Sequence, residues 1–533
     1  MRPLIIATLA VGAGAACATP AIAKDRKISP YIELSQVLTA DVQNGDVLTY
    51  TNLAAGIDAS LQSRRTQVQI SYRYDHRFAY NQRLTDADIH SGLARANFNV
   101  ASGISIEGGA IATRTRSDVR GDAPGILAGN VSNISQVYSL YAGPSIATHA
   151  GPIGVTANYR YGYTKVEAPG LTGVAPNQPR LDVYDSSHNQ LAAAALSLKP
   201  GVVLPVGVTV SGGWEQDEAR QLSQRYTGKY ARGDVLYPVA PTIALVAGVG
   251  YENIEISQRD PLRDANGQPV VDSRGRFVEN TAAPRRIAYN FDGIYYDAGV
   301  VWRPSPRTMA EVHVGRRYGS ISYTGSVTYQ PTRSVALAAR VYDGVTTFGR
   351  QLRDGLSTLP TSFTANGSAL GPDYNGCVFG ANGSAGGCLN GVFQSVSTAA
   401  FRARGADAVA TFGRGNTRFG VGAGYTNRKF LAPAEGGVLF TANGVTDESY
   451  YVQAFASRAL DSRTTVDANV FANFYDSGIA GASNVYSVGG TVGLGRSFGR
   501  LSARVIAGLY AFSRDGQQTV VNADALIGAR YQF

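Results

Sequence analysis

Hydrophobic and polar side chains alternate along much of this chain. Between Thr66 and Phe78, every second residue is apolar or aromatic, and most of the residues between them are polar or charged. The same period of two recurs in the segments that begin at Val155 and at Val466. Successive side chains of a strand point to opposite faces, so each segment predicts a β-strand with one apolar and one polar face. The chain is therefore predicted to be all-β.

Short turns separate the predicted strands and alternate with longer polar connections. The short links are rich in Gly, Pro, Ser and Arg, and lie at 62–65, 101–103, 150–152, 238–241, 303–306, 331–334, 413–416, 461–463 and 497–500. The longer connections cover roughly residues 116–130, 166–180, 258–285, 346–395 and 431–446. This alternation predicts a single transmembrane antiparallel β-barrel of about 22 strands (about 20 to 24), with periplasmic turns and external loops.

The N-terminus predicts export. Arg2 supplies a positive end, Leu4 to Ala16 are apolar, and Ala21-Ile22-Ala23 forms a small-x-small cleavage site. Residues 1–23 are thus predicted to be a cleaved signal peptide and residues 24–533 the barrel. A lipid anchor on Cys17 is the less favoured alternative, because Gly14 stands where a lipoprotein signal has a Leu-like residue.

Alternation alone does not place the chain in a membrane, because a soluble β-sandwich would also alternate. The C-terminus supplies further evidence for a membrane barrel. The final strand alternates and places Tyr531 and Phe533 on its apolar face. Aromatic residues at these positions look like the signal that the barrel assembly machinery reads. The predicted location is the Gram-negative outer membrane, and the expected partners are its lipid, the assembly machinery and periplasmic chaperones.

Composition supports a barrel and argues against a helical membrane protein. Gly 62, Tyr 30 and Phe 19 accompany only 16% charged residues, and the mean hydropathy is -0.09. A spanning helix needs about 20 apolar residues, and no stretch after the N-terminus approaches that length. The first strand is predicted to begin by about Ile32. We therefore expect no N-terminal plug, unlike in energised siderophore-type transporters.

The connection 346–395 holds both cysteines that remain after export. Cys377 and Cys388 lie in a Gly-, Asn- and Ser-rich stretch, and in an oxidising periplasm this spacing predicts one disulfide. We expect a long external loop stapled at its tip. The alternative is that the loop occludes the lumen.

Arginines on the polar faces of the strands are the best binding candidates. The chain carries a net charge of +9, of which Arg2 contributes one. Guanidinium groups in a water-filled pore attract anions. Neutralisation by acids such as Asp75, Glu311 and Asp524 is the favoured alternative, in which the pairs stiffen the wall. The lumen-facing selectivity candidates are Arg73, Arg160, Arg317, Arg340 and Arg530.

No residue set predicts an enzyme. The five histidines lack metal-ligand spacing, and His313 beside Glu311 is interpreted as a hydrated pair in the lumen. The glycine run from Gly420 to Gly424 sits in an alternating strand with no helix after it, so it does not predict a phosphate site. We expect no metal, no cofactor and no nucleic acid partner.

Residues 299–350 resemble a known family. The segments are Val301 to Thr308, Val314 to Ser320, Tyr323 to Tyr329, and Thr332-Arg333-Ser334. They are similar to the outer-membrane barrels associated with exosortase and PEP-CTERM systems, which are found beside exopolysaccharide gene clusters. The resemblance implies an outer-membrane location and a link with surface polysaccharide, and it implies no reaction.

Two functions follow as hypotheses. The first is a channel or export pore, with an anionic exopolysaccharide as the candidate solute. The second is a structural or surface-display barrel that binds a polysaccharide or a partner without transport. The polar lumen and the expected absence of a plug favour the first.

Overall fold

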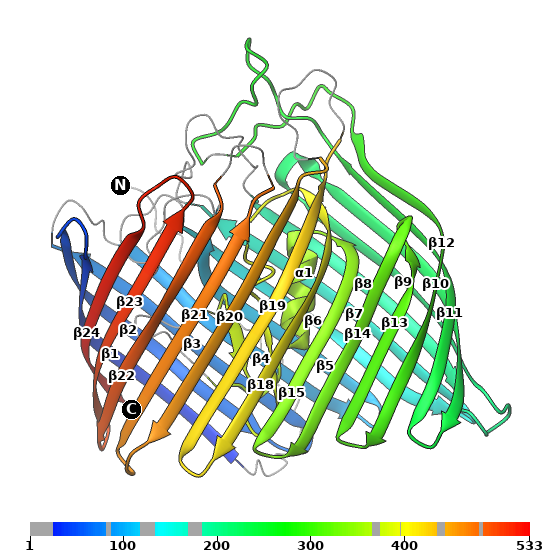
Figure 1. The fold of residues 1–533 in the computed structure, drawn as a ribbon, viewed down its shortest axis with the longest axis horizontal. Helices are drawn as coiled ribbons and strands as arrows, with labels where there is room; N and C mark the ends of the chain where they lie inside the picture. Colours follow the sequence, from blue (N-terminus) through cyan, green and yellow to red (C-terminus); the bar gives the residue numbers. More distant parts are fainter. Residues whose placement is uncertain are drawn as a thin grey trace.

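The strands close into one barrel (Figure 1). The computed structural model describes residues 25–80, 87–117, 134–168, 184–274, 276–364, 374–394, 396–433, 443–478 and 483–533. One 22-stranded sheet accounts for most of them. Its strands are β1 (Asp25–Asp41), β2 (Val47–Gln62), β3 (Thr66–Ala79), β4 (Ala87–Ala101), β5 (Ile104–Arg116), β6 (Ile134–Ala150), β7 (Ile153–Glu167), β8 (Ser186–Leu198), β9 (Gly207–Ala219), β10 (Arg225–Ala240), β11 (Ile243–Gln258), β12 (Arg286–Ser305), β13 (Thr308–Arg317), β14 (Ser320–Thr332), β15 (Val335–Thr346), β18 (Ala400–Arg414), β19 (Thr417–Leu431), β20 (Thr446–Ala459), β21 (Thr464–Asp476), β22 (Val485–Phe498), β23 (Leu501–Arg514) and β24 (Val520–Gln532).

Every strand of this sheet pairs antiparallel with its neighbours in the sequence, and the first pairs with the last. The closing register runs from Tyr31 opposite Gln532 to Asp41 opposite Asn522. Closure leaves no open edge, so the backbone hydrogen bonds of the ring are satisfied within it. The predicted strand number agrees with this ring.

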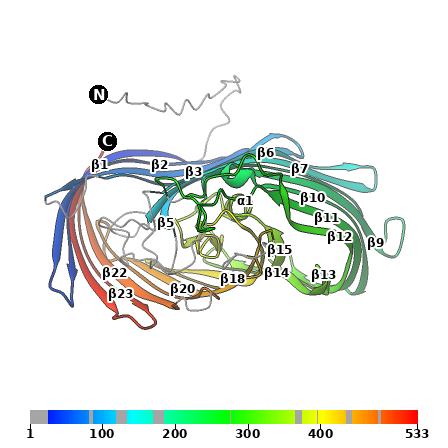
Figure 2. The same cartoon turned by 90° about the horizontal axis from the view of Figure 1, so that it is seen from above.

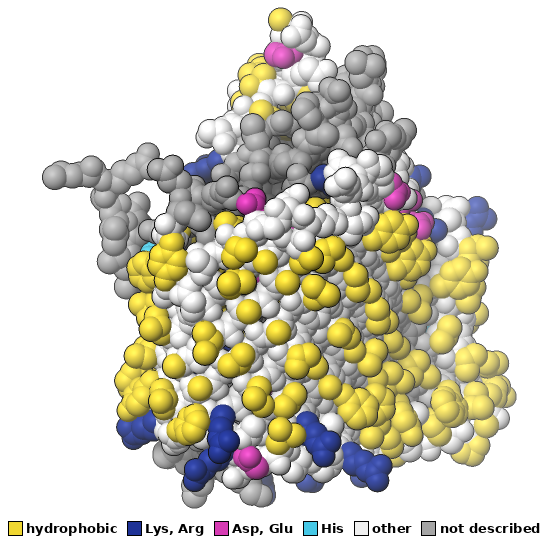
Figure 3. Space-filling view, turned by 60° about the vertical axis from the view of Figure 1, so that its left-hand side comes forward, with side chains coloured by type: hydrophobic (Ala, Val, Ile, Leu, Met, Phe, Trp, Pro, Cys, Tyr) yellow, Lys and Arg dark blue, Asp and Glu magenta, His cyan; other side chains and the backbone are white. Residues whose placement is uncertain are grey.

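The apolar faces point outward and the polar faces inward. In β1, Leu34 is 58% exposed, whereas the adjacent Glu33 is 1% exposed. Ile527 on β24 is 63% exposed, and hydrophobic side chains cover a broad band of the surface in Figure 3. A soluble protein would bury these side chains. A closed barrel with an apolar exterior belongs in a bilayer, and the chain is an outer-membrane protein.

The two ends of the barrel differ as predicted. The predicted short turns all lie at the end where β1 begins and β24 ends, which is the periplasmic end; one further short turn, Tyr318-Gly319 between β13 and β14, lies at the opposite end. A turn at the periplasmic end, at 199–206, was not predicted. The longer connections lie at the opposite end, where a 3-10 helix, η1 (Gln221–Ser223), also links β9 to β10. The predicted signal peptide and most of the predicted loops 116–130, 166–180 and 431–446 lie outside the described residues.

The barrel interior is occupied, contrary to our expectation. The connection between β15 and β18 leaves the extracellular end and folds back into the lumen, where it lies between the two long walls of a flattened barrel (Figure 2). It contains α1 (Phe348–Thr358), β16 (Cys377–Phe379) and β17 (Gly386–Cys388). We call residues 347–399 the inserted segment. The expected external loop is thus an internal one, because its apolar side chains find apolar partners on the inner wall.

Among the described residues, none of the helices has the length and apolar character needed to cross a bilayer.

Candidate functional site in the barrel lumen

The inserted segment begins with a capped helix. Thr347 precedes α1 with extended backbone, and its hydroxyl accepts a hydrogen bond from the Arg350 amide at 3.4 Å. This satisfies one of the free amides at the helix start. The same hydroxyl donates to the Asp217 carboxylate on β9 at 2.7 Å. The cap therefore also fixes the start of α1 against the wall.

One face of α1 packs on an apolar patch of the inner wall. Phe348, Leu352 and Leu356 are each 0% exposed, and their spacing puts them on one side of the helix. The patch comes from inward positions on β4 to β7, which a hydrated lumen would make polar. Its members are Leu93, Ile111, Val137, Tyr141 and Val166. Burial of these side chains holds α1 on this wall.

The tip of the inserted segment packs on the opposite wall. Cys377 and Cys388 lie opposite each other in the β16–β17 pair and are joined by a disulfide. They cluster with Phe379 and with Phe455 and Tyr451 of β20. The segment therefore spans the lumen and contacts both walls.

The glycine run of β19 makes room for this tip. A Cβ on Gly422 would lie 2.4 Å from the Cys377 sulfur, and one on Gly420 would lie 2.6 Å from the Phe379 ring. Both distances are shorter than any van der Waals contact. The run from Gly420 to Gly424 thus lets the tip of the inserted segment approach the backbone of β19.

Polar contacts lock the segment in register with the wall. Arg95 of β4 donates to the carbonyl oxygens of Leu359 at 3.0 Å and Ser357 at 3.1 Å. The side-chain amide of Gln453 on β20 accepts from the Cys377 amide at 2.8 Å. These bonds satisfy buried backbone groups of the segment that would otherwise be unpaired.

Glu215 of β9 is the main ionic contact of α1. Its carboxylate contacts the Arg350 guanidinium and lies 3.7 Å from that of Arg353. The Arg350 guanidinium also stands 3.7 Å from the centre of the Tyr226 ring. Burial, with a smaller effect of Arg353, lowers the pKa of Arg350 to about 9. Asp354 opposes this change by stabilising the charged form, and Arg350 is positively charged at neutral pH, as its contact with the Glu215 carboxylate requires.

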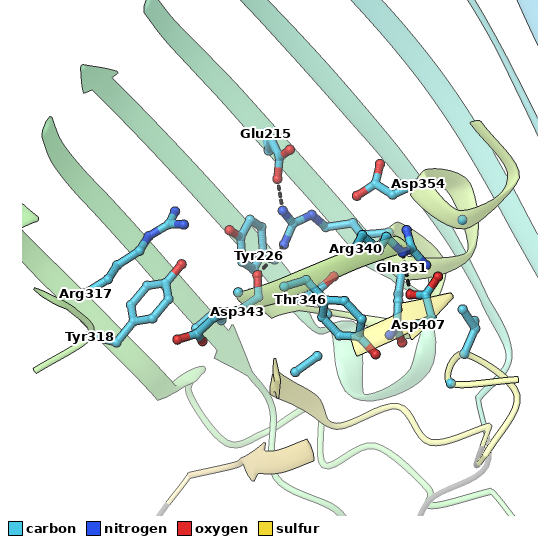
Figure 4. Close-up of a pocket in the computed structure, with 18 of the residues that line it drawn as sticks. Glu215, Tyr226, Arg317, Tyr318, Arg340, Asp343, Thr346, Gln351, Asp354 and Asp407 are labelled. Carbon is cyan, nitrogen blue, oxygen red and sulfur yellow. Dashed lines mark hydrogen bonds and ion pairs between the residues drawn. The ribbon is translucent and has the colours of Figure 1, made fainter. Parts of the chain in front are cut away.

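A cavity of about 310 Å³ lies between the inserted segment and the inner wall, where residues of β9, β10, β11, β13, β15, β18 and β20 line it. Figure 4 shows Glu215 above Tyr226, Arg317 beside Tyr318, and Arg340 facing Asp407. Three arginines and five carboxylates line it: Arg317, Arg340, Arg350, Glu215, Glu252, Asp343, Asp354 and Asp407. The lining therefore carries no excess of positive charge, although it is rich in hydrogen-bonding groups and tyrosines.

The five predicted lumen arginines all point inward, and each meets a carboxylate. Arg73 lies 3.0 Å from Glu33 and 2.8 Å from Asp75, and Arg530 lies 2.8 Å from Glu33. The other ion pairs are Arg160 with Glu107 at 2.6 Å, Arg317 with Glu252 at 2.5 Å, and Arg340 with Asp407 at 2.5 Å. The arrangement fits charge-matched ladders that stiffen the wall, and whether the arginines also select solutes stays a prediction.

The predicted assembly signal also lies where the alternation put it. Tyr531 and Phe533 are 37% and 61% exposed on the outer face, with ring centres 5.2 Å apart. They form part of the lipid-facing surface at the periplasmic rim. Their recognition by the assembly machinery stays a prediction.

His313 takes part in a network of charges. Its Nδ1 lies 2.8 Å from Asp297, and its Nε2 lies 2.7 Å from Glu311. Arg232 in turn binds Asp297. Because both ring nitrogens are engaged by carboxylates, the histidine is held in place and not presented to a substrate. Within the ranges that the structure describes, no group of His, Cys, Asp or Glu could hold a metal ion.

Sequence reasoning missed Glu215, Arg95 and the apolar inner patch. Leu93, Ile111 and Val137 are apolar residues at positions whose neighbours on the same face are polar. Such breaks in the alternation are the one local sign that something packs inside the barrel.

No protein family model and no curated protein matches the sequence. Among solved structures, the FrpB iron transporter from Neisseria meningitidis (F5-1 variant) matches with a TM-score of 0.44 at 10% identity, over 96% of this chain and 83% of that one. The ferric-catecholate import receptor Fiu from E. coli K12 matches with a TM-score of 0.45 at 10% identity, over 96% and 82%. OccAB4 from Acinetobacter baumannii matches with a TM-score of 0.31 at 10% identity, over 96% and 100%.

The structure corrects one part of the predicted fold. The prediction of a barrel with no plug is wrong, because the connection between β15 and β18 lies inside the barrel and contacts both walls. In the described part of this chain, the lumen is filled by the inserted segment.

Proposed function

We propose that this protein is an outer-membrane channel whose open cross-section is set by the inserted segment. The observation that carries the proposal is the position of this segment, which spans the lumen from the apolar patch on β4–β7 to β18–β20. The barrel supplies the water-filled path, and the segment narrows it. The solute is a polar molecule that passes the cavity beside α1.

The charge-matched lining favours neutral or cationic solutes over anions. Among the residues that line the cavity, carboxylates outnumber arginines, and Arg317 and Arg340 are neutralised by Glu252 and Asp407. An ion pair lowers the potential that a free guanidinium would present to an anion. The link with an exopolysaccharide rests on the resemblance of residues 299–350 alone, and the comparisons lend it no support.

Conductance of the purified protein in a planar bilayer tests the proposal. We expect small, discrete steps for the full chain and larger steps when a short Gly/Ser linker replaces residues 348–398. A lumen that conducts in neither form would contradict the channel and favour the surface-display hypothesis. Migration of unheated protein on a gel shows whether the shortened barrel is folded.

A further inference from the structure

The periplasmic rim of the barrel is basic. Figure 3 shows Lys and Arg side chains along the lower rim, below the hydrophobic band. Short turns there carry several exposed arginines, and the acidic residue among these turns is Asp461. Its carboxylate accepts hydrogen bonds from the amides of Arg463 at 2.7 Å and Thr464 at 2.8 Å, so it is engaged by its own turn.

Five of these arginines gather on the wall from β18 to β23, and we call them the periplasmic arginine patch. They are Arg414, Arg458, Arg463, Arg496 and Arg500, and all five are exposed. None lies within ion-pair distance of a carboxylate in the part of the chain that the structure describes, and the one carboxylate that feels the patch is Asp461, whose pKa is lowered by backbone hydrogen bonds and, to a smaller extent, by Arg496. The lumen differs, since its predicted candidates all meet carboxylates. Clustered positive charges repel one another and lower the stability of the folded barrel. An anionic partner bound to the patch would reduce this repulsion.

The patch lies at the level where the barrel wall leaves the bilayer. Outward strand positions near it are aromatic: Phe412 is 37% exposed, Phe419 is 42% exposed, and their ring centres are 5.2 Å apart. The Arg496 guanidinium stands 5.7 Å from the ring of Phe498, which is 55% exposed. Aromatic belts of barrels sit at the lipid–water interface. Phospholipid phosphates occupy that depth.

Register places three of the arginines in one outward row. Arg414 and Arg458 both pair with Thr417 of β19, on either side of it, so the three residues share a face. Arg496 sits two strands beyond Arg458, opposite Thr464. Neighbouring strands are about 4.8 Å apart, so each arginine of the row stands about 10 Å from the next one along the rim.

We propose that the periplasmic arginine patch binds the phosphate groups of anionic phospholipids in the inner leaflet. The planar guanidinium fork matches phosphate oxygens, and the long aliphatic stem can lie along the apolar wall. A soluble acidic protein would meet the turns but not the outward row beside the phenylalanines. The inference does not depend on what passes through the lumen.

The test uses the full chain in detergent with equal amounts of phosphatidylglycerol and phosphatidylcholine that have identical acyl chains. Native mass spectrometry counts the lipids retained. The variant Arg414→Gln/Arg458→Gln/Arg496→Gln is compared with Arg220→Gln/Arg263→Gln/Arg274→Gln, which removes the same charge from the extracellular end. Gel migration before and after heating shows that each barrel is folded.

We expect the wild type to retain phosphatidylglycerol in preference to phosphatidylcholine, and the preference to fall with added salt. A basic side chain near an anionic surface contributes about fivefold, so the triple patch variant should lose at least about tenfold of the preference. The extracellular variant should keep it. A wild type without preference, or an equal preference in both variants, would overturn the proposal and leave a periplasmic polymer or protein as the occupant.

Discussion

Leu352→Ala tests whether the inserted segment is held by its contacts with the wall. Leu352 is 0% exposed and lies between α1 and the apolar patch on β4–β7. Truncation of a buried leucine costs about 2 to 5 kcal/mol. Leu352 lies outside the 22-stranded ring, so its truncation destabilises the docked position of α1 and not the barrel itself. The undocked population should then rise by about 30-fold to a few thousandfold.

Limited trypsin digestion measures this population directly. Arg350 and Arg353 are 6% and 0% exposed while α1 is docked, so cleavage after them requires undocking. When opening and closing are fast, the cleavage rate follows the open population. Leu509→Ala is the matched control, because Leu509 is 58% exposed on the lipid face and loses the same atoms. Equal cleavage rates for the two variants would refute the reasoning.

Three further predictions concern the same site. Glu215→Gln leaves Arg350 without its carboxylate, which costs about 3 to 5 kcal/mol for a buried pair. Trypsin should therefore cleave faster after Arg350 and Arg353. Unchanged cleavage rates would show that this ion pair does not hold α1 on the wall. Gly422→Ala places a methyl group against the Cys377 sulfur and should expose the Cys377–Cys388 disulfide, so that an added thiol reductant reduces it faster. Gly233→Ala, with open space around it, should not change the rate, and equal reduction rates in the two variants would argue against docking at β19. Arg340→Gln leaves Asp407 unpaired in the cavity wall, so the reversal potential in a salt gradient should shift toward cation selectivity. Arg64→Gln, in a periplasmic turn, is the control and should not produce this shift.

The barrel could be predicted because its signal is local. Alternation within about 12 residues sets which side chains face lipid, and the turn residues set where each strand ends. The inward position of Arg73 and the outward position of Ile70 both follow from that pattern. Orientation follows as well, since the predicted short turns lie on the side where β1 begins and β24 ends.

The lumen could not be predicted in the same way, because its contacts join distant parts of the chain. Arg530 meets Glu33 of β1, which was not among the acids named from the sequence, since closure of the ring brings β24 beside β1. The docking of α1 depends on Leu93 and Val137, which lie more than two hundred positions earlier. A Gly-, Asn- and Ser-rich composition indicated an external loop, yet it says nothing about where the few apolar residues of that loop are buried.

An engineered disulfide tests the internal position of the inserted segment most directly. A Cβ on Gly391 would lie 3.7 Å from the Cβ of Thr426, an inward residue of β19, and disulfides have Cβ atoms about 3.5 to 4.5 Å apart. We predict that Gly391→Cys with Thr426→Cys forms a cross-link without added oxidant in the exported protein, detected by mass and by gel mobility. Gly391→Cys with Val421→Cys, whose side chain faces lipid from the same strand, should stay reduced. Free thiols in the first pair would show that the segment lies outside the barrel and would contradict the account.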